Sequence, residues 1–297
     1  MRIAIITGAS SGIGREFARQ IPKLYRQLDE IWVAARSTDK LKELEKELPL
    51  PVRIFDGDLT RDYIYERIGR ELERKSADIR MLVNAAGYGL IGEAAKLDMK
   101  SQAGMIDLNC RALTKMTLMC IPYMSAGSRI LQIASAAAFA PQPDFAVYAA
   151  TKSYVYSFAR GTGSELKRKG IVTTVVCPGP VDTAFFERAG ASGSDFKQKF
   201  MSGPKDVVHK ALADSAARRE VSVYGAAMKA ARAAAKLLPS RLVILLMKAG
   251  SKKAGNKKNK RKNRHCFRGQ MKKRVCCWMQ CRFCQKYQTK MFTSKDK

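Results

Sequence analysis

The sequence predicts an α/β fold of the doubly wound type: an open parallel sheet of about seven strands with helices on both faces. Short apolar segments rich in β-branched residues alternate with helix-like segments from the first residues onward, and a glycine-rich turn joins the first such pair. Near-continuous apolar character is typical of strands that are buried on both faces. Strand–helix alternation over about 220 residues indicates one parallel sheet.

Six segments have the length and composition of buried strands. They are residues 3–6, 31–34, 52–55, 81–83, 129–133 and 172–176, and a last strand is expected at 221–224. Helices are expected at about 12–27, 38–47, 60–75, 98–121, 146–168 and 204–219.

Composition divides the 297 residues into three parts. Residues 1–225 form the predicted dinucleotide-binding (Rossmann) domain. Residues 226–249 begin Ala-rich, break at Pro239 and end in an apolar run that is too short to span a bilayer. We expect this segment to dock on the body or pair with another subunit, with a membrane interface as the alternative. Residues 250–297 have little apolar periodicity, so we expect them to be disordered.

The net charge of +29 is concentrated at the C-terminal end. Residues 248–297 contain 18 Lys and Arg and one acid, Asp296, and so carry +17 of the total. Such a charge belongs to a tail rather than to the folded body. A basic run with interspersed aromatic residues is able to contact an anionic membrane or nucleic acid non-specifically.

The cysteines divide in the same way. Cys110, Cys120 and Cys177 stand singly in apolar surroundings, as buried reduced thiols do. The other five lie in the tail, where only Cys281-x-x-Cys284 has clean metal-ligand spacing. We therefore predict no metal site. A strand-like start at Met1 leaves no room for a signal peptide, and we expect a cytoplasmic location, peripheral to a membrane surface if the C-terminal segments bind lipid.

A glycine-rich turn follows the first predicted strand. It reads Gly8-Ala9-Ser10-Ser11-Gly12-Ile13-Gly14, opens the helix expected at about 12–27 and is followed by Arg15. Glycines permit a tight turn and a close approach of a pyrophosphate to the backbone, and the helix N-terminus offers free N–H groups. The spacing differs from Gly-x-Gly-x-x-Gly, but the position between strand and helix is the one that dinucleotide binding requires.

Two arginines favour NADP over NAD as the cofactor. The second predicted strand ends at Ala35-Arg36, where an NAD-binding chain usually has an acid for the ribose hydroxyls. Arg15 and Arg36 instead suit a 2′-phosphate, which guanidinium groups grip bidentately. Asp58-Leu59 follows the third strand at the expected adenine loop, and Asn84-Ala85-Ala86-Gly87 ends the fourth strand near the expected nicotinamide.

Tyr148 and Lys152 are the candidate catalytic pair. Residues four apart lie on one face of a helix. The ammonium group is expected to lower the pKa of the phenol toward the range useful for acid–base catalysis. Ser135, at the end of the preceding strand, is placed to hydrogen-bond the same substrate oxygen.

In combination, these residues resemble the short-chain dehydrogenase/reductase family over about residues 1–225. The motifs are Thr7-Gly8-x3-Gly12-x-Gly14, Asn84-Ala85-Ala86-Gly87, Asn109, Ser135, Tyr148-x3-Lys152 and Pro178-Gly179. The resemblance implies that Tyr148 is the acid/base, Lys152 lowers its pKa and holds the nicotinamide ribose, Ser135 polarises the substrate oxygen and Asn109 supports a proton relay. It also implies that Pro178, Gly179, Val181 and Thr183 grip the nicotinamide end.

The resemblance further implies an oxidoreductase that interconverts a carbonyl and an alcohol, in a homodimer or homotetramer formed through residues 98–121 and 146–168. Residues 184–203 contain Phe185, Phe186, Phe196, Phe200 and Met201, which suits a flap over an apolar substrate of the ketoacyl or steroid type.

Two alternatives stay open at this point. The same fold also serves non-enzymatic dinucleotide sensors and scaffold proteins, and the basic tail is able to be the main binding activity. A chain truncated at residue 249 distinguishes the tail-binding alternative from the enzyme, because it would lose binding to RNA or anionic vesicles and keep reductase activity.

Overall fold

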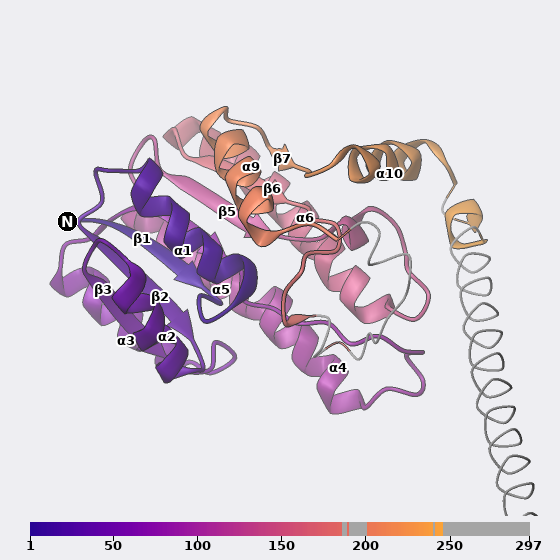
Figure 1. The fold of residues 1–297 in the computed structure, drawn as a ribbon, viewed down its shortest axis with the longest axis horizontal. Helices are drawn as coiled ribbons and strands as arrows, with labels where there is room; N and C mark the ends of the chain where they lie inside the picture. The colour runs from indigo at the N-terminus through magenta and orange to yellow at the C-terminus, as the bar shows by residue number, and fades with distance from the viewer. Residues whose placement is uncertain (186–188, 190–200, 240, 246–297) are drawn as a thin grey trace, which may run out of the picture. The chain divides into compact units, whose positions relative to one another are not determined.

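The computed structural model describes residues 1–185, 189, 201–239 and 241–245 (Figure 1). Within this part of the chain, seven parallel strands form one sheet in the order β3-β2-β1-β4-β5-β6-β7. The strands are β1 (Arg2–Thr7), β2 (Glu30–Ala35), β3 (Val52–Asp56), β4 (Asp78–Asn84), β5 (Arg129–Ile133), β6 (Val172–Val176) and β7 (Val221–Ser222). The predicted doubly wound α/β fold is confirmed.

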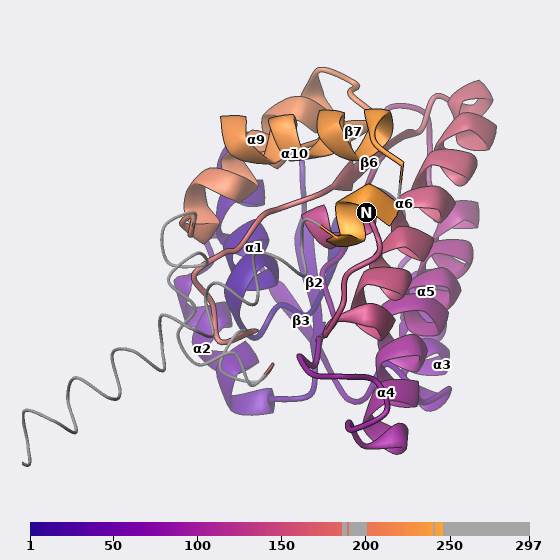
Figure 2. The same cartoon turned by 90° about the vertical axis from the view of Figure 1, so that its right-hand side faces the viewer.

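Helices cover both faces of the sheet (Figure 2). On one face, α1 (Gly12–Leu24), α2 (Thr38–Glu47) and α9 (Pro204–Ala216) share a core that includes Phe17, Leu41 and Val208. On the other face, α3 (Tyr63–Arg74), α5 (Leu113–Cys120) and α6 (Ala146–Leu166) pack on residues such as Trp32 and Leu82. Strand residues alternate between the two cores, so Ile3 and Ile5 lie in the second and Ala4 and Ile6 in the first.

The expected helix at 98–121 is divided in three. It consists of α4 (Met99–Ile106), a π-helical segment (Asp107–Ala112) and α5. A π-helical segment is one wider turn inside a helix and is frequent at functional sites. This segment contains Asn109, which is fully buried.

The other boundaries differ from expectation at the ends of elements. The first helix ends at Leu24 rather than residue 27, because the chain turns toward β2 and the Asp29 N–H donates to the Arg2 carbonyl oxygen at 2.8 Å. The third helix begins at Tyr63 rather than residue 60, α9 ends at Ala216 rather than 219, and β7 ends at Ser222 rather than 224.

The segment that follows β7 forms α10 (Ala226–Leu237). Gly225, at φ +86°, starts this helix, which ends before Pro239. It lies against the short 3-10 turn Ala136–Phe139, and Leu237, Leu242 and Leu245 are exposed. Of the helices described here, none combines the length and apolar character needed to cross a bilayer.

Some expectations concern residues outside the described ranges. They are the disorder and metal or nucleic-acid contacts of residues 250–297, and the flap positions Phe186, Phe196 and Phe200.

Candidate active site

The glycine turn between β1 and α1 is a backbone-to-backbone contact that excludes side chains. Gly8 has φ +68°, and a Cβ there would lie 2.7 Å from the Ala86 nitrogen. A Cβ on Gly14 would lie 2.3 Å from the Gly8 carbonyl oxygen. These two glycines therefore let the ends of β1 and β4 and the start of α1 meet in one place.

The start of α1 is open to an anion. Ser10, Ser11 and Ile13 are partly exposed, and the Ser11 carbonyl oxygen accepts from the Arg15 N–H at 3.2 Å. No side chain caps this end of the helix, and its first turn contains no acid. Free N–H groups and the positive end of the helix dipole therefore favour a phosphate here.

Thr7, named above only as the first residue of the glycine motif, has a structural role in the site. Its Oγ1 accepts from the N–H groups of Ala85 (3.1 Å) and Ala86 (3.2 Å), which fixes the loop after β4 beside the glycine turn. The signal was in the sequence, since Thr7 ends β1 immediately before Gly8.

The two arginines predicted to bind a 2′-phosphate have different surroundings. Arg36 is exposed, and within the described ranges no hydrogen bond or ion pair holds its side chain. The Arg15 guanidinium instead donates from Nη2 to Glu47 Oε1 at 2.7 Å, with Glu43 at 3.7 Å. Glu47 also accepts from Arg19 at 2.7 Å. Arg15 is therefore neutralised by acids of α2, which the sequence prediction did not include.

Asp58 and Leu59 follow β3 as expected. Asp58 Oδ1 accepts from the N–H and the hydroxyl of Thr60, both at 2.9 Å, and so holds the loop in shape. Leu59 is buried in the core beneath it.

Asn84 points into the core rather than toward the glycine turn. Its Nδ2 donates to Thr117 Oγ1 (3.0 Å) and Gln132 Oε1 (3.1 Å), and its side chain is buried. This network joins β4, β5 and α5. The Asn84 side chain therefore holds the end of β4, from which the loop Ala85-Ala86-Gly87 leaves the sheet.

Ser135, Tyr148 and Lys152 come together beyond the carboxyl end of β5. Lys152 Nζ donates to the Ile133 carbonyl oxygen at 2.8 Å and lies 5.7 Å from the centre of the Tyr148 ring. Ser135 hydrogen-bonds Tyr148, and Ser135 Oγ also accepts from the Ala137 N–H at 3.1 Å. A Cβ on Gly87 would lie 3.4 Å from Lys152 Nζ, so the loop after β4 borders the same group.

Asn109 is held in place by three hydrogen bonds. Nδ2 donates to the Tyr88 carbonyl oxygen (2.9 Å) and Thr151 Oγ1 (3.0 Å), and Oδ1 accepts from the Tyr88 N–H (3.1 Å). The Thr151 hydroxyl donates to the Tyr148 carbonyl oxygen at 2.8 Å. Asn109 therefore joins the loop after β4 to the first turn of α6, and Thr151 is a further site residue, recognisable only as the neighbour of Lys152.

Burial dominates the acidity of the catalytic pair. It raises the pKa of Tyr148 to about 12, while the hydrogen bond from Ser135 acts in the lowering direction. Burial lowers the pKa of Lys152 to about 8. The expected lowering of the Tyr148 pKa by Lys152 is not seen here, because desolvation dominates and the hydrogen bond with Ser135, not Lys152, acts in the lowering direction.

Aromatic side chains enclose Tyr148. The Phe145 ring stacks on it at 4.3 Å between centres, and the Phe185 ring lies tilted at 5.4 Å. A Cβ on Gly89 would lie 2.7 Å from Tyr148 Cδ2. Phe185 was expected in the substrate flap, whereas Phe145 and Gly89 were not predicted.

The segment after β6 reaches the glycine turn. The Pro178 carbonyl oxygen accepts from the Ala136 N–H at 2.8 Å, next to Ser135. A Cβ on Gly12 would lie 3.1 Å from Thr183 Cγ2. Gly179 lies against Met228 of α10, and Val181 pairs with Ser202 in an isolated parallel bridge.

These residues fit a bound nicotinamide dinucleotide in chemistry. The open N-terminus of α1 and the close backbone approach at Gly8 and Gly14 suit a pyrophosphate. Lys152 lies beside both Tyr148 and the loop after β4. Among the described residues, no cluster of three or more His, Cys, Asp and Glu side chains is able to hold a metal ion.

Comparison with known proteins identifies the family. Residues 2–192 match the short chain dehydrogenase family, and the chain belongs to it. An uncharacterised oxidoreductase of Staphylococcus epidermidis is 29% identical over 200 residues, which cover 67% of this chain and 84% of that protein.

Two relatives have named activities. A 17-beta-hydroxysteroid dehydrogenase type 3 of Mus musculus is 31% identical over 190 residues, covering 61% of this chain and 60% of that protein. A very-long-chain 3-oxoacyl-CoA reductase of Anas platyrhynchos is 33% identical over 186 residues, covering 59% and 58%. Among solved structures, a short-chain dehydrogenase from Sphingobium yanoikuyae in complex with NADPH has a TM-score of 0.67 and 28% identity, covering 80% of this chain and 94% of that one.

Proposed function

We propose that this oxidoreductase uses NADP(H) to interconvert a carbonyl and a secondary alcohol on an apolar substrate. Membership of the short-chain dehydrogenase family supports the reaction class. The observation that carries the proposal is the convergence of Ser135, Tyr148 and Lys152 beside the glycine turn and the loop after β4.

The chain's own residues supply orientation and a proton. When bound, the nicotinamide supplies the hydride. Tyr148 donates its phenolic proton to the oxygen of the reduced carbonyl, and Ser135 orients that oxygen through its hydroxyl. With its pKa raised to about 12, Tyr148 is fully protonated at neutral pH and ready to act as the acid. Lys152, fixed on the Ile133 carbonyl oxygen, stabilises the phenolate that remains.

The choice of NADP rests on Arg36. It follows β2 with no acid beside it, and it is exposed and not engaged by another described side chain. A guanidinium in this position favours a 2′-phosphate. The NADPH complex of the similar Sphingobium dehydrogenase is consistent with this choice.

The surroundings of Tyr148 support an apolar substrate. Tyr148 belongs to a buried cluster against which five apolar or aromatic side chains pack: Tyr88, Leu90, Phe145, Val147 and Phe185. The named activities of the two vertebrate relatives, on a hydroxysteroid and a long-chain oxoacyl group, are consistent with such a substrate.

A Tyr148→Phe variant tests the function. We expect turnover of NADPH with a series of ketones of graded chain length to fall by at least about a hundredfold, because the proton donor is lost, while NADPH binding is retained. Tyr154→Phe is the matched control, since Tyr154 lies on the exposed side of α6 and its hydroxyl bonds the Thr114 hydroxyl at 2.7 Å, the one hydrogen bond it makes within the described part of the chain. Unchanged turnover in Tyr148→Phe would remove the assignment, and NADH serves as the cofactor control.

Oligomeric state and location are part of the same proposal. Exposed apolar residues on α4, α5 and α6 support a homodimer or homotetramer. The buried free thiols of Cys110, Cys120 and Cys177 are consistent with a reducing, cytoplasmic location. The exposed leucines and basic residues after Gly225 would make any membrane contact peripheral.

A further inference from the structure

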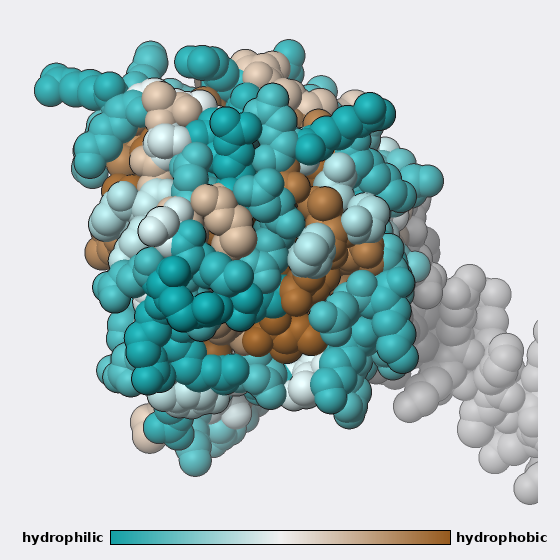
Figure 3. All heavy atoms as spheres, turned by 90° about the vertical axis from the view of Figure 1, so that its left-hand side faces the viewer, coloured by the Kyte–Doolittle hydropathy of each residue, from teal (hydrophilic) through white to brown (hydrophobic). Residues whose placement is uncertain are grey.

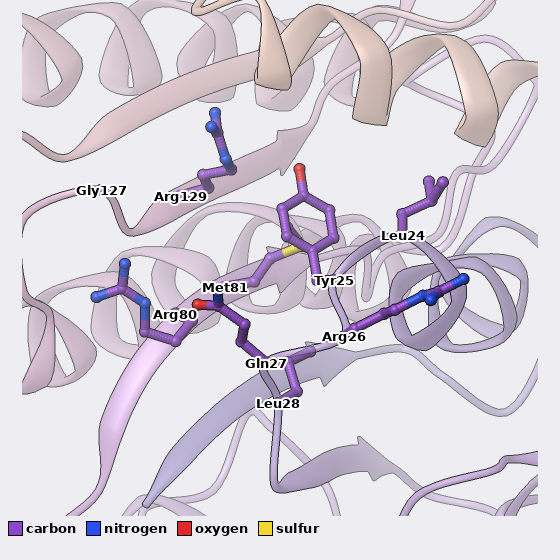
Figure 4. A pocket seen from close by; sticks show the side chains of 9 residues that line it. All are labelled: Leu24, Tyr25, Arg26, Gln27, Leu28, Arg80, Met81, Gly127 and Arg129. Atoms are coloured by element: carbon purple, nitrogen blue, oxygen red, sulfur yellow. The ribbon is translucent and has the colours of Figure 1, made fainter.

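A cavity of about 470 Å³ lies near the amino ends of strands β4 and β5 (Figure 4). Tyr148 lies at the opposite, carboxyl end of the strands. The lining of the cavity comes from the turn after α1 and from the first residues of β4 and β5. The lining residues are Leu24, Tyr25, Arg26, Gln27, Leu28, Arg80, Met81, Gly127 and Arg129. Arg129 begins β5 and Ile133, which holds Lys152, ends it, so the two sites lie about 13 Å apart along one strand.

The lining is basic and contains no acid. Arg80, Arg129 and Arg26 contribute three guanidinium groups. Arg80 is partly neutralised by Asp78 at 3.3 Å and also donates to the Ala126 carbonyl oxygen at 3.2 Å. Arg129 donates one N–H to the Ser215 carbonyl oxygen. Within the described ranges no carboxylate pairs with Arg129 or Arg26, so a positive charge remains at the cavity.

The cavity offers the Tyr25 hydroxyl as a hydrogen-bond donor beside apolar walls. Tyr25 lies against the core with its hydroxyl unbonded among the described residues, and burial raises its pKa while the charge of Arg129 acts in the lowering direction. Figure 4 shows Arg80 and Arg129 on one side of the Tyr25 ring and Leu24 and Arg26 on the other. Leu28 and Met81 form buried walls, and Leu24, at 51% exposure, forms an apolar rim.

We propose that this cavity binds a small amphipathic anion: one carboxylate head group on an apolar body of medium length. The size lies within the range of small-molecule sites. A carboxylate matches the planar fork of Arg129 and accepts from the Tyr25 hydroxyl, and the apolar body lies on Leu24, Leu28 and Met81. Figure 3, which views the molecule from the side on which the N-terminus lies in Figure 1, shows a hydrophobic area within a mainly hydrophilic surface.

The site is separate from the cofactor site by its position. The glycine turn and Tyr148 lie at the carboxyl ends of the strands, whereas Arg80 and Arg129 lie near their amino ends. An anion in this cavity and NADPH should therefore bind together rather than compete.

Titration calorimetry of the full chain with decanoate, in the presence of saturating NADPH, tests the proposal. We expect one decanoate site, with much weaker binding of decanol, which lacks the charge, and of inorganic phosphate, which lacks the apolar body. The Arg26→Gln/Arg129→Gln variant should bind decanoate at least about tenfold more weakly, since a hydrogen bond to a charged group contributes about 1.5–3 kcal/mol. The control Arg70→Gln/Arg168→Gln removes the same charge at exposed positions outside the cavity and should bind normally.

Leu24→Asp provides a second variant that keeps the Arg129–Ser215 contact. It places a negative charge at the exposed rim and should also weaken decanoate binding, while circular dichroism stays unchanged. Competition between decanoate and NADPH, equal binding of decanol and decanoate, or equal binding by the two arginine pairs would overturn the proposal. Absence of decanoate binding to the unaltered chain up to millimolar concentration would do the same.

Discussion

The acidity of Tyr148 illustrates what spacing along a helix leaves out. The Tyr-x-x-x-Lys pattern correctly predicts that Tyr148 and Lys152 share one face of α6. It carries no information on desolvation, which depends on Phe145, Phe185 and Gly89 from separate segments. Because burial raises the pKa of a phenol and lowers that of an ammonium, the pair reaches the neutral state more readily than the pattern alone predicts.

The pH dependence of stability should reveal the buried lysine. The pKa of Lys152 is about 8 in the folded chain against 10.5 ordinarily, so between these values the unfolded state binds more protons and the free energy of unfolding rises with pH. We expect the unaltered chain to gain about 3 kcal/mol relative to Lys152→Met between pH 7 and pH 11. Denaturant unfolding at several pH values measures the difference.

Lys23→Met is the control for that series, because Lys23 is exposed at the end of α1. A difference between the unaltered chain and Lys152→Met that stays flat from pH 7 to pH 11 would mean that the ammonium is not desolvated.

Glu47 should act as a competitor of the cofactor's 2′-phosphate for Arg15. We expect Glu47→Gln to bind NADPH about two- to fivefold more tightly, since a part-exposed ion pair contributes about 0.4–1 kcal/mol. NADH binding should not change, because NADH has no 2′-phosphate. Fluorescence titration measures both affinities.

Glu43→Gln is the matched control for Glu47→Gln, since Glu43 lies 3.7 Å from Arg15 and is more exposed. If the affinities for NADH and NADPH rise equally in Glu47→Gln, Arg15 does not contact the 2′-phosphate.

At the scale of elements, the glycine turn is the most demanding local structure. A Cβ on Gly14 would lie 2.3 Å from the Gly8 carbonyl oxygen, which belongs to the backbone and has little freedom to move. We expect Gly14→Ala to lower the free energy of unfolding by at least about 2 kcal/mol and to abolish NADPH binding. Denaturant titration and cofactor fluorescence measure the two effects.

Gly161→Ala is the control for helical glycine replacement. Gly161 lies in α6 with nothing within 4 Å of a built Cβ, so alanine should stabilise the chain by about 0.5–1 kcal/mol. Equal losses of stability in Gly14→Ala and Gly161→Ala would contradict the close contact at Gly14.

The elements differ in how far the sequence predicts them. Apolar β-branched runs predict β1 to β6 well, because such a composition is typical of strands that pack in the interior of a sheet, and it also identifies the partly buried edge strand β3. The π-helical segment at Asp107–Ala112 is not predictable in this way, since the helical pattern of the sequence continues through it without a break. Likewise, the ion pair of Arg15 with Glu47 joins residues that are 32 positions apart, in α1 and α2, so no local pattern in the sequence predicts it.

At the scale of the whole molecule, α4, α5 and α6 present an apolar surface formed by large exposed side chains. Met99, Ile106, Leu118 and Tyr154 are exposed there, whereas Met116 of α5 is buried in the core. Tyr154 stacks on Phe158 at 5.8 Å, which holds part of this surface rigid. Such a surface is typical of a subunit interface.

Sedimentation should show whether copies of the chain associate through these helices. We expect the unaltered chain to sediment as a dimer or tetramer and Leu118→Glu to shift it toward the monomer, because a buried charge without a partner opposes association. Leu24→Glu is the matched control, since Leu24 is 51% exposed and Leu118 is 55% exposed on a different face. An identical shift in both variants would show that α5 is not part of the interface.

The packing around Tyr148 has one more consequence, for the motion of its ring. The Phe145 ring stacks on one face of the Tyr148 ring, and the Phe185 ring lies tilted beside it. The backbone at Gly89 borders an edge of the Tyr148 ring so closely that even a methyl group would not fit. A half-turn of the phenol about its Cβ–Cγ bond would require all three neighbours to retreat. The direction of the Tyr148 hydroxyl is therefore fixed before a substrate binds, and the side chain loses little orientational entropy on proton transfer.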